Sequence, residues 1–393
     1  MTMWQSGDVT LYQGDCLEML KTLPDGCVHC VVTSPPYWAM RNYGVPGQLG
    51  LEPTIKEYVA NLVAVFQEVR RVLRDDGTLW LNMGDCYSGS WGAMSHTPGS
   101  KNADRMGYQS KPANATIAGL KPKQLVGMPW RVAFALQADG WYLRRDIIWH
   151  KLNPMPESVT DRPTTAHEYI FLLSKSERYF YDAEAVREPQ TGNAHSRGNG
   201  ITPKSAPTGG PIRANTSFHA ATAGLVVIPG GRNKRSVWSI ACEGFHGDHF
   251  AVFPQKLVDP CILAGTSAHG CCPYCGAPWV RVIERTTEPR RGMRGSRFDA
   301  GKTARRDGGN RTQPGERYET RAIGWRPSCK CNAGKPVPCT VLDPFGGSGT
   351  TAVVAVKHGR RAILIELNPE YCGMAQKRIA AAQAQLRLPL VPG

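Results

Sequence analysis

The sequence lacks any apolar run that is long enough to cross a membrane. None of its windows would span a bilayer, and residues 1–8 lack the basic and apolar regions of a secretory signal peptide. We therefore expect a cytoplasmic protein. In a reducing compartment the 13 cysteines are expected to be thiols or metal ligands rather than a disulfide framework.

Acidic residues are also scarce relative to basic ones. The 393 residues include 32 Asp and Glu against 47 Lys and Arg, which gives a formal net charge of +15. This excess favours a polyanionic partner, most simply nucleic acid; the alternative is a basic but otherwise ordinary enzyme. The length allows one large domain or two with a substantial buried core.

Residues 28–38 combine a strand with a rigid turn. The β-branched and apolar run Val28–Thr33 predicts a buried strand, and the proline pair 35–36 must end it because neither proline can donate to a sheet ladder. Ser34 and Tyr37 then lie at the carboxyl end of the strand, where open α/β sheets bind ligands. A planar substrate could stack there. The alternative is a strand exit whose aromatic residues pack back on the core.

A second strand and turn lie near the other end of the sequence. A strand is predicted over Cys339–Leu342, a glycine-rich turn over Asp343–Gly349, and a helix from about residue 350 to 358. Glycines let a ligand approach the backbone, and a helix N-terminus favours a carboxylate. No lysine follows the last glycine, as a phosphate loop requires, and the third glycine of the dinucleotide fingerprint is missing.

Together the two stretches resemble the signature motifs of the amino-group DNA methyltransferases. Thr33-Ser34-Pro35-Pro36-Tyr37 is similar to the catalytic (Asp/Asn/Ser)-Pro-Pro-(Tyr/Phe) motif, and Asp343–Thr350 is similar to the cofactor loop Asp-Pro-Phe-x-Gly-Ser-Gly-Thr. The serine form resembles the cytosine-N4 branch. The order, with the catalytic motif first, is that of the β group. The resemblance covers residues 7–185 and 236–385.

This resemblance implies a permuted Rossmann-like α/β sheet, in which strands 28–33 and 340–342 lie side by side. It implies S-adenosylmethionine as methyl donor, double-stranded DNA as substrate, and a bacterial or phage origin, with a cognate restriction endonuclease as a possible partner. The predicted catalytic residues are Ser34, Pro35, Pro36 and Tyr37. The predicted cofactor-binding residues are Asp15, Asp343, Phe345, Gly346, Gly347, Ser348, Gly349, Thr350 and Glu366.

Two of the cofactor assignments also have a physical argument. Glu366 ends the next predicted strand, about 20 residues beyond the glycines, where an acid suits a ribose diol. Asp15 follows Gly14 at a strand end and could accept from an adenine amino group; its alternative is a helix N-cap. S-adenosylmethionine has a carboxylate, a ribose diol and an adenine but no pyrophosphate, so it fits better than NAD. Phe253 and Pro254 are weaker candidates to wall its methionine end.

Cytosine-N4 methylation has three alternatives at this stage. The nearest is adenine-N6 methylation, because both bases present a similar exocyclic amine. A more distant one is methylation of a protein glutamine amide, against which the large basic insertions argue. The last is a zinc- and DNA-binding protein with an inactive methyltransferase core, against which the intact cofactor loop and Glu366 argue.

Periodicity predicts the elements between the two motifs. A helix is expected over 54–73, capped by Thr54 and stopped by Gly77, followed by a strand over 78–82. A second helix is expected over 123–137, interrupted or restarted at Pro129. Strands over 141–151 and 167–175 are expected to pair as an antiparallel hairpin. His167 and Glu168 are interpreted as structural or groove-lining residues.

Cysteines form a candidate zinc knuckle. Cys272 and Cys275 precede a turn glycine, and Cys329 and Cys331 could supply the other two thiolates of a tetrahedral site. Cys271 and Cys339 are spare candidates, and the alternative is unliganded thiols. No histidine lies beside the pairs and methyl transfer needs no metal, so we expect any zinc to be structural.

These segments give five expected regions. They are a catalytic half (1–185), a basic target-recognition segment (186–248), a helix docking on the cofactor site (249–270), a zinc-knuckle and arginine-rich insertion (271–331) and a cofactor half (332–393). The arginines of 281–326 suit contacts to phosphates and guanine edges; the alternative is a solvated basic loop.

Overall fold

The computed structural model describes residues 2–88, 119–189, 232–243, 253–289, 316–332 and 334–387. The chain divides into two compact units: residues 1–185, 235–280 and 327–393 form the first, and residues 186–234 and 281–326 form the second. Most of the two basic segments predicted to contact DNA lies outside the described residues. No helix in the described ranges combines the length and the apolar character needed to cross a bilayer.

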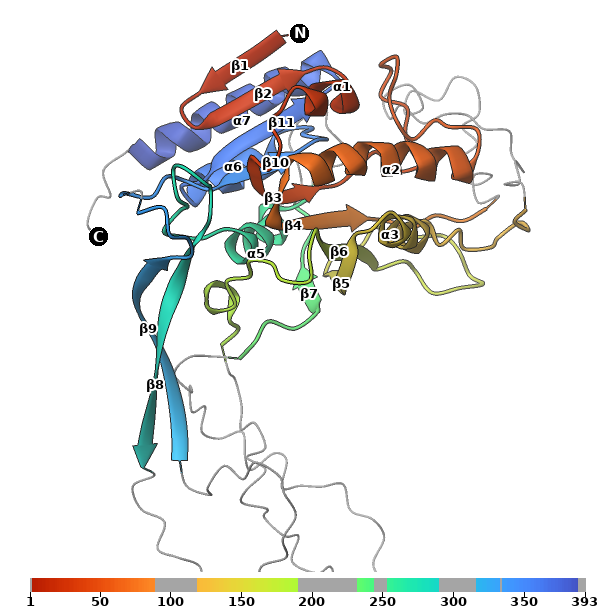
Figure 1. The fold of residues 1–393 in the computed structure, drawn as a ribbon. Helices are drawn as coiled ribbons and strands as arrows, with labels where there is room; N and C mark the ends of the chain where they lie inside the picture. The colour runs from red at the N-terminus through yellow and green to blue at the C-terminus, as the bar shows by residue number, and fades with distance from the viewer. Residues whose placement is uncertain are drawn as a thin grey trace, which may run out of the picture. The chain divides into compact units, whose positions relative to one another are not determined.

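A nine-stranded sheet forms the centre of the first unit, in the order β1-β2-β11-β10-β3-β4-β6-β5-β7 (Figure 1). The strands are β1 (Thr2–Ser6), β2 (Val9–Gln13), β3 (Val28–Thr33), β4 (Leu73–Met83), β5 (Tyr142–Lys151), β6 (His167–Ser174), β7 (Val237–Ile240), β10 (Thr340–Asp343) and β11 (Arg361–Glu366). The five strands from β2 to β4 are parallel neighbours, and β6 runs antiparallel to both β4 and β5.

Helices cover both faces of this sheet. They are α1 (Cys16–Lys21), α2 (Ile55–Val72), α3 (Met128–Ala138), α5 (Gln255–Gly265), α6 (Thr350–Lys357) and α7 (Pro369–Arg387), with a short 3-10 helix η2 (Glu184–Val186). Because side chains alternate along a strand, Leu79 and Leu81 of β4 join the core under α1, α2 and α3. Trp80 points to the other face, toward α5. The result is the expected α/β fold in three layers.

The permutation expected from the motif order is confirmed. Strand β3 pairs in parallel with β10, with Cys30 opposite Val341 and Val31 opposite Leu342. Residues that are far apart in the sequence therefore form the middle of one sheet. Because parallel strands end at the same edge, the turns after β3 and β10 are neighbours.

The predicted stop at Gly77 of the helix expected over 54–73 is wrong. Helix α2 begins after the expected cap, where Thr54 Oγ1 accepts from Glu57 N at 3.1 Å, but it ends at Val72 and β4 begins at Leu73. A Cβ on Gly77 would lie 2.5 Å from the Leu73 side chain. The glycine therefore permits a close approach inside the strand, at an irregularity in its pairing with β3.

Helix α3 also begins later than predicted, at Met128. Pro129 lies in its first turn, where a proline is tolerated, and does not interrupt it. The cap comes from a distant residue, because Asp85 Oδ1 accepts from Met128 N at 3.0 Å. The helix expected within residues 249–270 begins at Gln255, and residues 249–252 lie outside the described residues.

The antiparallel hairpin of β5 and β6 is confirmed, with Trp149 opposite Glu168 and His150 opposite His167. Strands β5 and β7 lie beyond β6 in the sheet. At the other edge, β1 was not predicted because its five residues are mostly polar and exposed, as edge strands often are.

In the second unit the arginine-rich insertion is more regular than its composition suggests. Strands β8 (Trp279–Pro289) and β9 (Glu316–Pro327) form a two-stranded sheet. The guanidinium of Arg281 lies over the Trp325 ring, 4.4 Å from its centroid, which is a cation–π contact across the pair.

Candidate active site

The turn after β3 is held rigidly from below. Trp38 is 3% exposed and its Nε1 donates to the Glu52 carbonyl at 2.9 Å. Tyr58 Oη donates to the Pro36 carbonyl at 2.9 Å. Trp38 therefore supports the turn from within the core, and the turn itself has little freedom to move.

Tyr37 belongs to a chain of polar contacts at this edge of the sheet. Ser34 Oγ donates to Tyr37 Oη at 3.3 Å, and Tyr37 Oη donates to Glu168 Oε2 at 2.8 Å. Asn82 Nδ2 donates to the same carboxylate at 3.1 Å, and Lys151 Nζ donates to its Oε1 at 2.5 Å. Burial first, and then the Glu168 charge, raise the pKa of Tyr37 well above its usual value. Tyr37 is therefore a neutral donor at neutral pH.

Close packing fixes the position of the Tyr37 ring. A Cβ on Gly84, just beyond the end of β4, would lie 2.9 Å from Tyr37 Cε2 and 3.4 Å from Glu168 Cδ. A side chain at position 84 would therefore displace the tyrosine or its carboxylate partner.

The turn after β10 is organised by one buried carboxylate. Asp343 is 1% exposed; its Oδ1 accepts from Thr33 Oγ1 at 2.6 Å and from Phe345 N at 3.1 Å, and its Oδ2 accepts from Thr351 Oγ1 at 2.7 Å. Burial raises the pKa of Asp343 to about 6, against the effect of these donors. The contact with Thr33 joins the predicted cofactor loop to the predicted catalytic strand.

The glycines of this turn bring the backbone close to its surroundings. Gly346 N donates to the Ile365 carbonyl at 2.8 Å, and Gly347 N donates to Glu366 Oε2 at 2.7 Å. Gly349 has a φ of +81°, and a Cβ there would lie 2.9 Å from Ala375 Cβ. Any other residue at position 349 would have a strained backbone conformation and its Cβ would clash with Ala375.

The two side-chain hydroxyls of the turn accept hydrogen bonds from an arginine side chain of the same protein. Arg378 Nη1 of α7 lies 2.6 Å from Ser348 Oγ and 3.0 Å from Thr350 Oγ1. The side chains of Ser348 and Thr350 therefore fasten the loop to α7.

Two acidic residues lie at the ends of adjacent strands. Glu366 ends β11, and Asn368 N donates to its Oε1 at 2.8 Å; burial, with Asp343 as a lesser cause, raises its pKa. Asp15 follows β2 and caps α1, accepting from Glu18 N at 3.1 Å. Gly14 N donates to the Glu366 carbonyl at 2.9 Å, so both carboxylates belong to one edge. The cap is the alternative that the sequence left open for Asp15.

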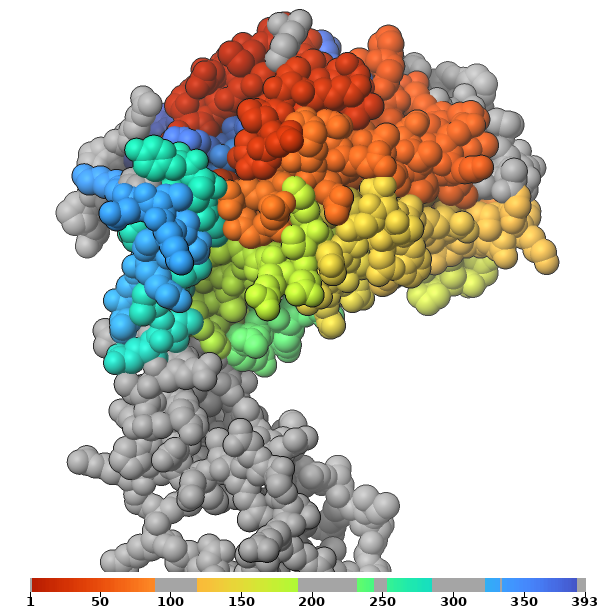
Figure 2. All heavy atoms as spheres, in the orientation of Figure 1, coloured from red at the N-terminus to blue at the C-terminus, as the bar shows by residue number. Residues whose placement is uncertain are grey.

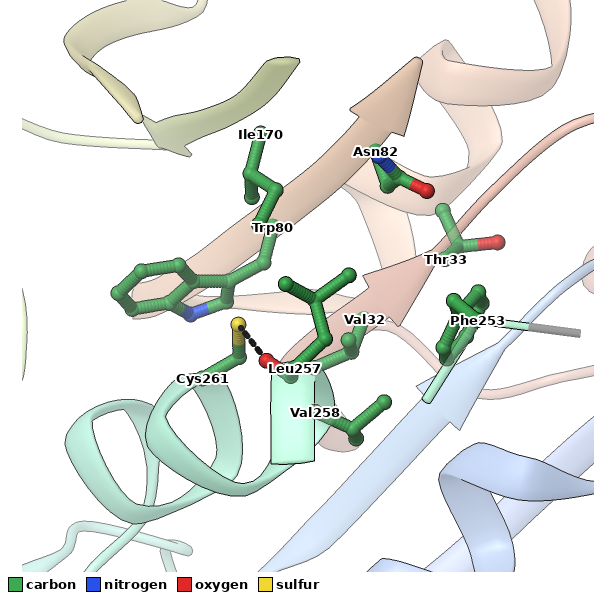
Figure 3. A pocket seen from close by; sticks show the side chains of 9 residues that line it. All are labelled: Val32, Thr33, Trp80, Asn82, Ile170, Phe253, Leu257, Val258 and Cys261. Atoms are coloured by element: carbon green, nitrogen blue, oxygen red, sulfur yellow. Dashed lines mark hydrogen bonds between the residues drawn. The ribbon is translucent and has the colours of Figure 1, made fainter. Parts of the chain in front are cut away.

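A hollow beside β3 is also lined by residues of β4, β6 and α5 (Figure 3). It is lined by Val32, Thr33, Trp80, Asn82, Ile170, Phe253, Leu257, Val258 and Cys261. Phe253, a candidate to wall the methionine end of the cofactor, lies in this lining together with Thr33 and Asn82. Pro254 caps α5 and is not among the lining residues.

Asn82 and Lys151 are not predicted as site residues from the sequence, and Glu168 is predicted only as a structural or groove-lining residue. One signal was available, because Lys151 ends one predicted hairpin strand and Glu168 is the second residue of the other. Opposite charges near the ends of two paired strands can lie close enough to form an ion pair. The structure thus brings every predicted catalytic and cofactor-binding residue to one edge of the sheet, and their roles stay predictions.

The four predicted metal-ligating cysteines also come together. The Sγ atoms of Cys272, Cys275, Cys329 and Cys331 all lie within 4.8 Å of one another. A second group, His29, Cys271 and Cys339, meets the same criterion. Both groups lie in the first unit.

Comparison with known proteins identifies the family. Residues 28–272 and 338–377 match a model of the N6/N4 DNA methylases, described as DNA methylase. The chain is 39% identical to the type II methyltransferase M.Cfr9I of Citrobacter freundii over 94% of this chain and 87% of that protein. It is 38% identical to the type II methyltransferase M.SmaI of Serratia marcescens over 93% and 89%.

Among solved structures, the PvuII DNA methyltransferase (cytosine-N4-specific) is similar in fold. It is 18% identical, with a TM-score of 0.50, over 99% of this chain and 89% of that chain. The likeness supports the permuted Rossmann-like sheet expected from the motifs. On the family match and the two relatives, the chain belongs to the N6/N4 family of DNA methylases and is a type II DNA methyltransferase.

Proposed function

We propose that this protein transfers the methyl group of S-adenosylmethionine to the exocyclic N4 amine of cytosine in double-stranded DNA. The observation that carries the proposal is the hydrogen bond between Thr33 Oγ1 and Asp343 Oδ1 at 2.6 Å. It joins the Ser-Pro-Pro-Tyr turn to the glycine-rich turn, so the cofactor and the target base would meet at adjacent strand ends.

The residues at the β10 and β11 ends suit this cofactor. The Glu366 carboxylate receives two backbone donors and has further lone pairs for a ribose diol. The turn has no basic residue for a pyrophosphate, and the backbone around Gly347 and Gly349 allows a close approach. When bound, S-adenosylmethionine supplies an electrophilic methyl group on a sulfonium.

The chain of hydrogen bonds sets the direction in which Ser34 can act. Its hydroxyl hydrogen points to Tyr37 Oη, which in turn donates to Glu168, a carboxylate paired with Lys151. Lone pairs of Ser34 Oγ are thereby left to accept a hydrogen of the target amine. The Pro35 carbonyl would accept the second hydrogen, which favours a pyramidal nitrogen whose lone pair is aimed at the methyl group.

Ser34 acts as a hydrogen-bond acceptor and not as a general base, because its hydroxyl is not basic at neutral pH. The amine becomes strongly acidic only after it is methylated. Most of the acceleration then comes from positioning and electrostatics. The target base must leave the duplex to reach this edge, and the Tyr37 ring would stack on it.

Serine at position 34 is the feature that favours cytosine over adenine. The net charge of +15 supports duplex DNA as substrate. The relatives M.Cfr9I and M.SmaI carry the name type II methyltransferase, so we propose a cognate restriction endonuclease as the companion activity.

One experiment tests the reaction and the base together. Purified protein is incubated with S-adenosylmethionine and unmethylated genomic DNA, and the DNA is digested to nucleosides for mass spectrometry. We expect N4-methylcytosine. N6-methyladenine would overturn the choice of base and keep the mechanism. Absence of any methylated nucleoside, with cofactor binding shown by calorimetry, would overturn the proposed activity.

A further inference from the structure

Four cysteines from two distant segments form a compact cluster. Their Sγ atoms lie within 4.8 Å of one another, and the segments that carry them lie side by side, teal around residue 275 and light blue around residue 330 (Figure 2). In a tetrahedral site with Zn–S bonds of about 2.3 Å, the sulfurs are about 3.8 Å apart. A small inward movement would bring the cluster to that geometry.

The first pair lies on a tight turn of the kind that presents two thiolates to one ion. Gly276 N donates to the Cys272 carbonyl, and Cys272 N donates to the Ala277 carbonyl, both at 2.9 Å. Gly276 has a φ of +68°, a conformation that favours glycine. The turn thus folds back directly after Cys275, and its two sulfurs face the same side.

Little apolar packing holds the second pair in place. Cys331 and its neighbours Lys330 and Asn332 are exposed, and Tyr274 beside the first pair is 81% exposed. Roughly fifty residues separate the two pairs, and closing a loop of that length costs conformational entropy. Ser328 Oγ donates to the Pro278 carbonyl at 2.6 Å, and the pairing of β8 with β9 lies between the two cysteine pairs. These contacts offset part of that cost before any ion binds.

We propose that Cys272, Cys275, Cys329 and Cys331 bind one structural zinc ion, an inference that does not depend on the proposed function. Four thiolates complete a tetrahedral shell and leave no open position for a substrate. On binding, each thiol loses its proton to solvent and its sulfur forms a bond to the ion. The ion closes the base of the segment between the pairs.

The proposed site is connected to the centre of the sheet. The Cys275 carbonyl accepts from Arg74 Nη1 at 2.5 Å, and the Gly276 carbonyl lies 2.9 Å from His29 Nε2. His29 Nδ1 accepts from Thr340 N at 3.0 Å, so Nε2 carries the hydrogen and donates to Gly276. Zinc would therefore fix a turn that is hydrogen-bonded to β3 and, through His29, to the start of β10.

The neighbouring group of His29, Cys271 and Cys339 is not a second metal site. Both imidazole nitrogens already bond to backbone groups, so the ring offers no lone pair to an ion. Cys271 also pairs through its backbone with Val337, with N···O distances of 2.8 and 2.9 Å. Cys271 and Val337 therefore form a β-bridge next to the four-cysteine cluster.

Metal analysis of the whole protein tests the proposal. The parent, Cys329→Ser, Cys331→Ser and the control Cys242→Ser are purified without chelator, and zinc and iron are measured by mass spectrometry of the elements. Cys242 is half-buried and lies outside the cluster. We expect one zinc for each chain in the parent and the control, and a loss of at least tenfold in the two cluster variants.

Cobalt replacement keeps the test informative if a serine variant folds poorly. Exchange of zinc for Co²⁺ should give the intense visible bands of a tetrahedral thiolate site. In Cys331→His the bands should move to shorter wavelength, because one sulfur is replaced by a nitrogen. Iron in the parent, equal zinc in all four proteins, disulfide bonds within the cluster, or a metal-free parent would each overturn the assignment.

Discussion

The two turns at the centre of the sheet use their polar side chains in opposite ways. After β10, the side chains of Asp343, Ser348 and Thr350 are bonded to the protein itself. After β3, Ser34 Oγ makes one long hydrogen bond within the described residues, to Tyr37 Oη at 3.3 Å. The turn after β10 therefore presents its backbone to the ligand, and the turn after β3 presents a side chain. Substitutions should separate the two roles.

Removal of the presented side chain should have the largest effect. Ser34→Ala takes away one acceptor of the target amine, and we expect kcat to fall about 100- to 1,000-fold. Affinity for S-adenosylmethionine, measured by calorimetry, should stay within a factor of two or so. Ser6→Ala, a similar change on β1, is the control. A Ser34→Ala enzyme with parental kcat would sink the assignment.

Crowding the backbone of the other turn should act on binding and stability instead. In Gly349→Ala the new Cβ would lie 2.9 Å from Ala375 Cβ at a φ of +81°, and we expect a loss of about 2–3 kcal/mol in unfolding free energy with weaker cofactor binding. Gly359→Ala is a matched control, because Gly359 has a φ of +66° but no atom within 4 Å of its Cβ. Chemical denaturation measures the difference. Equal losses in the two variants would show that space at position 349 is irrelevant.

The carboxylate behind Tyr37 sharpens the comparison. Glu168→Gln keeps the shape but removes the charge that Tyr37 and Lys151 bond to, and we expect kcat to fall about tenfold as the charge-assisted contacts that hold Tyr37 weaken. A double-mutant cycle with Tyr37→Phe should be clearly non-additive. Additive effects on kcat would mean that Glu168 acts independently of Tyr37.

The smallest expected effect depends on pH. Burial raises the pKa of Asp343 from 3.8 to about 6, so its ionisation opposes folding, and its contribution to stability is lost as pH rises from about 4 to 6. Thr351→Val removes a donor to the charged form and should extend this loss to higher pH. We expect a cost of about 1–2 kcal/mol at pH 8 and less at pH 5. Urea denaturation of both proteins at the two pH values measures it; a cost that is independent of pH would contradict the role given to Thr351.

The sequence was most informative where local chemistry decides the structure. Strand β3 has the predicted bounds, because a β-branched run ends at two prolines that cannot continue a ladder. The pairing of β3 with β10 could be predicted only through the family motifs. Periodicity alone does not specify which distant strand is a neighbour.

The errors arose where tertiary contacts outweigh local preference. Gly77 looked like a helix stop, but it serves a close approach to Leu73 inside β4. The helix expected over 123–137 begins only at Met128, whose amide donates to Asp85, a residue far away in the sequence. Glu168 could not be recognised as the partner of Tyr37, since their contact depends on the register of β6 against β4.

The strand order has a consequence for synthesis of the protein on the ribosome. Strand β3 is among the first to be made, and its neighbour β10 is separated from it by roughly 300 residues, which take about 15–60 s to translate at about 5–20 residues per second. Throughout that interval one edge of a fully buried, β-branched strand has no partner. The nascent chain is therefore prone to aggregation for a long period, during which a chaperone bound near residues 28–33 would cover the unpaired strand.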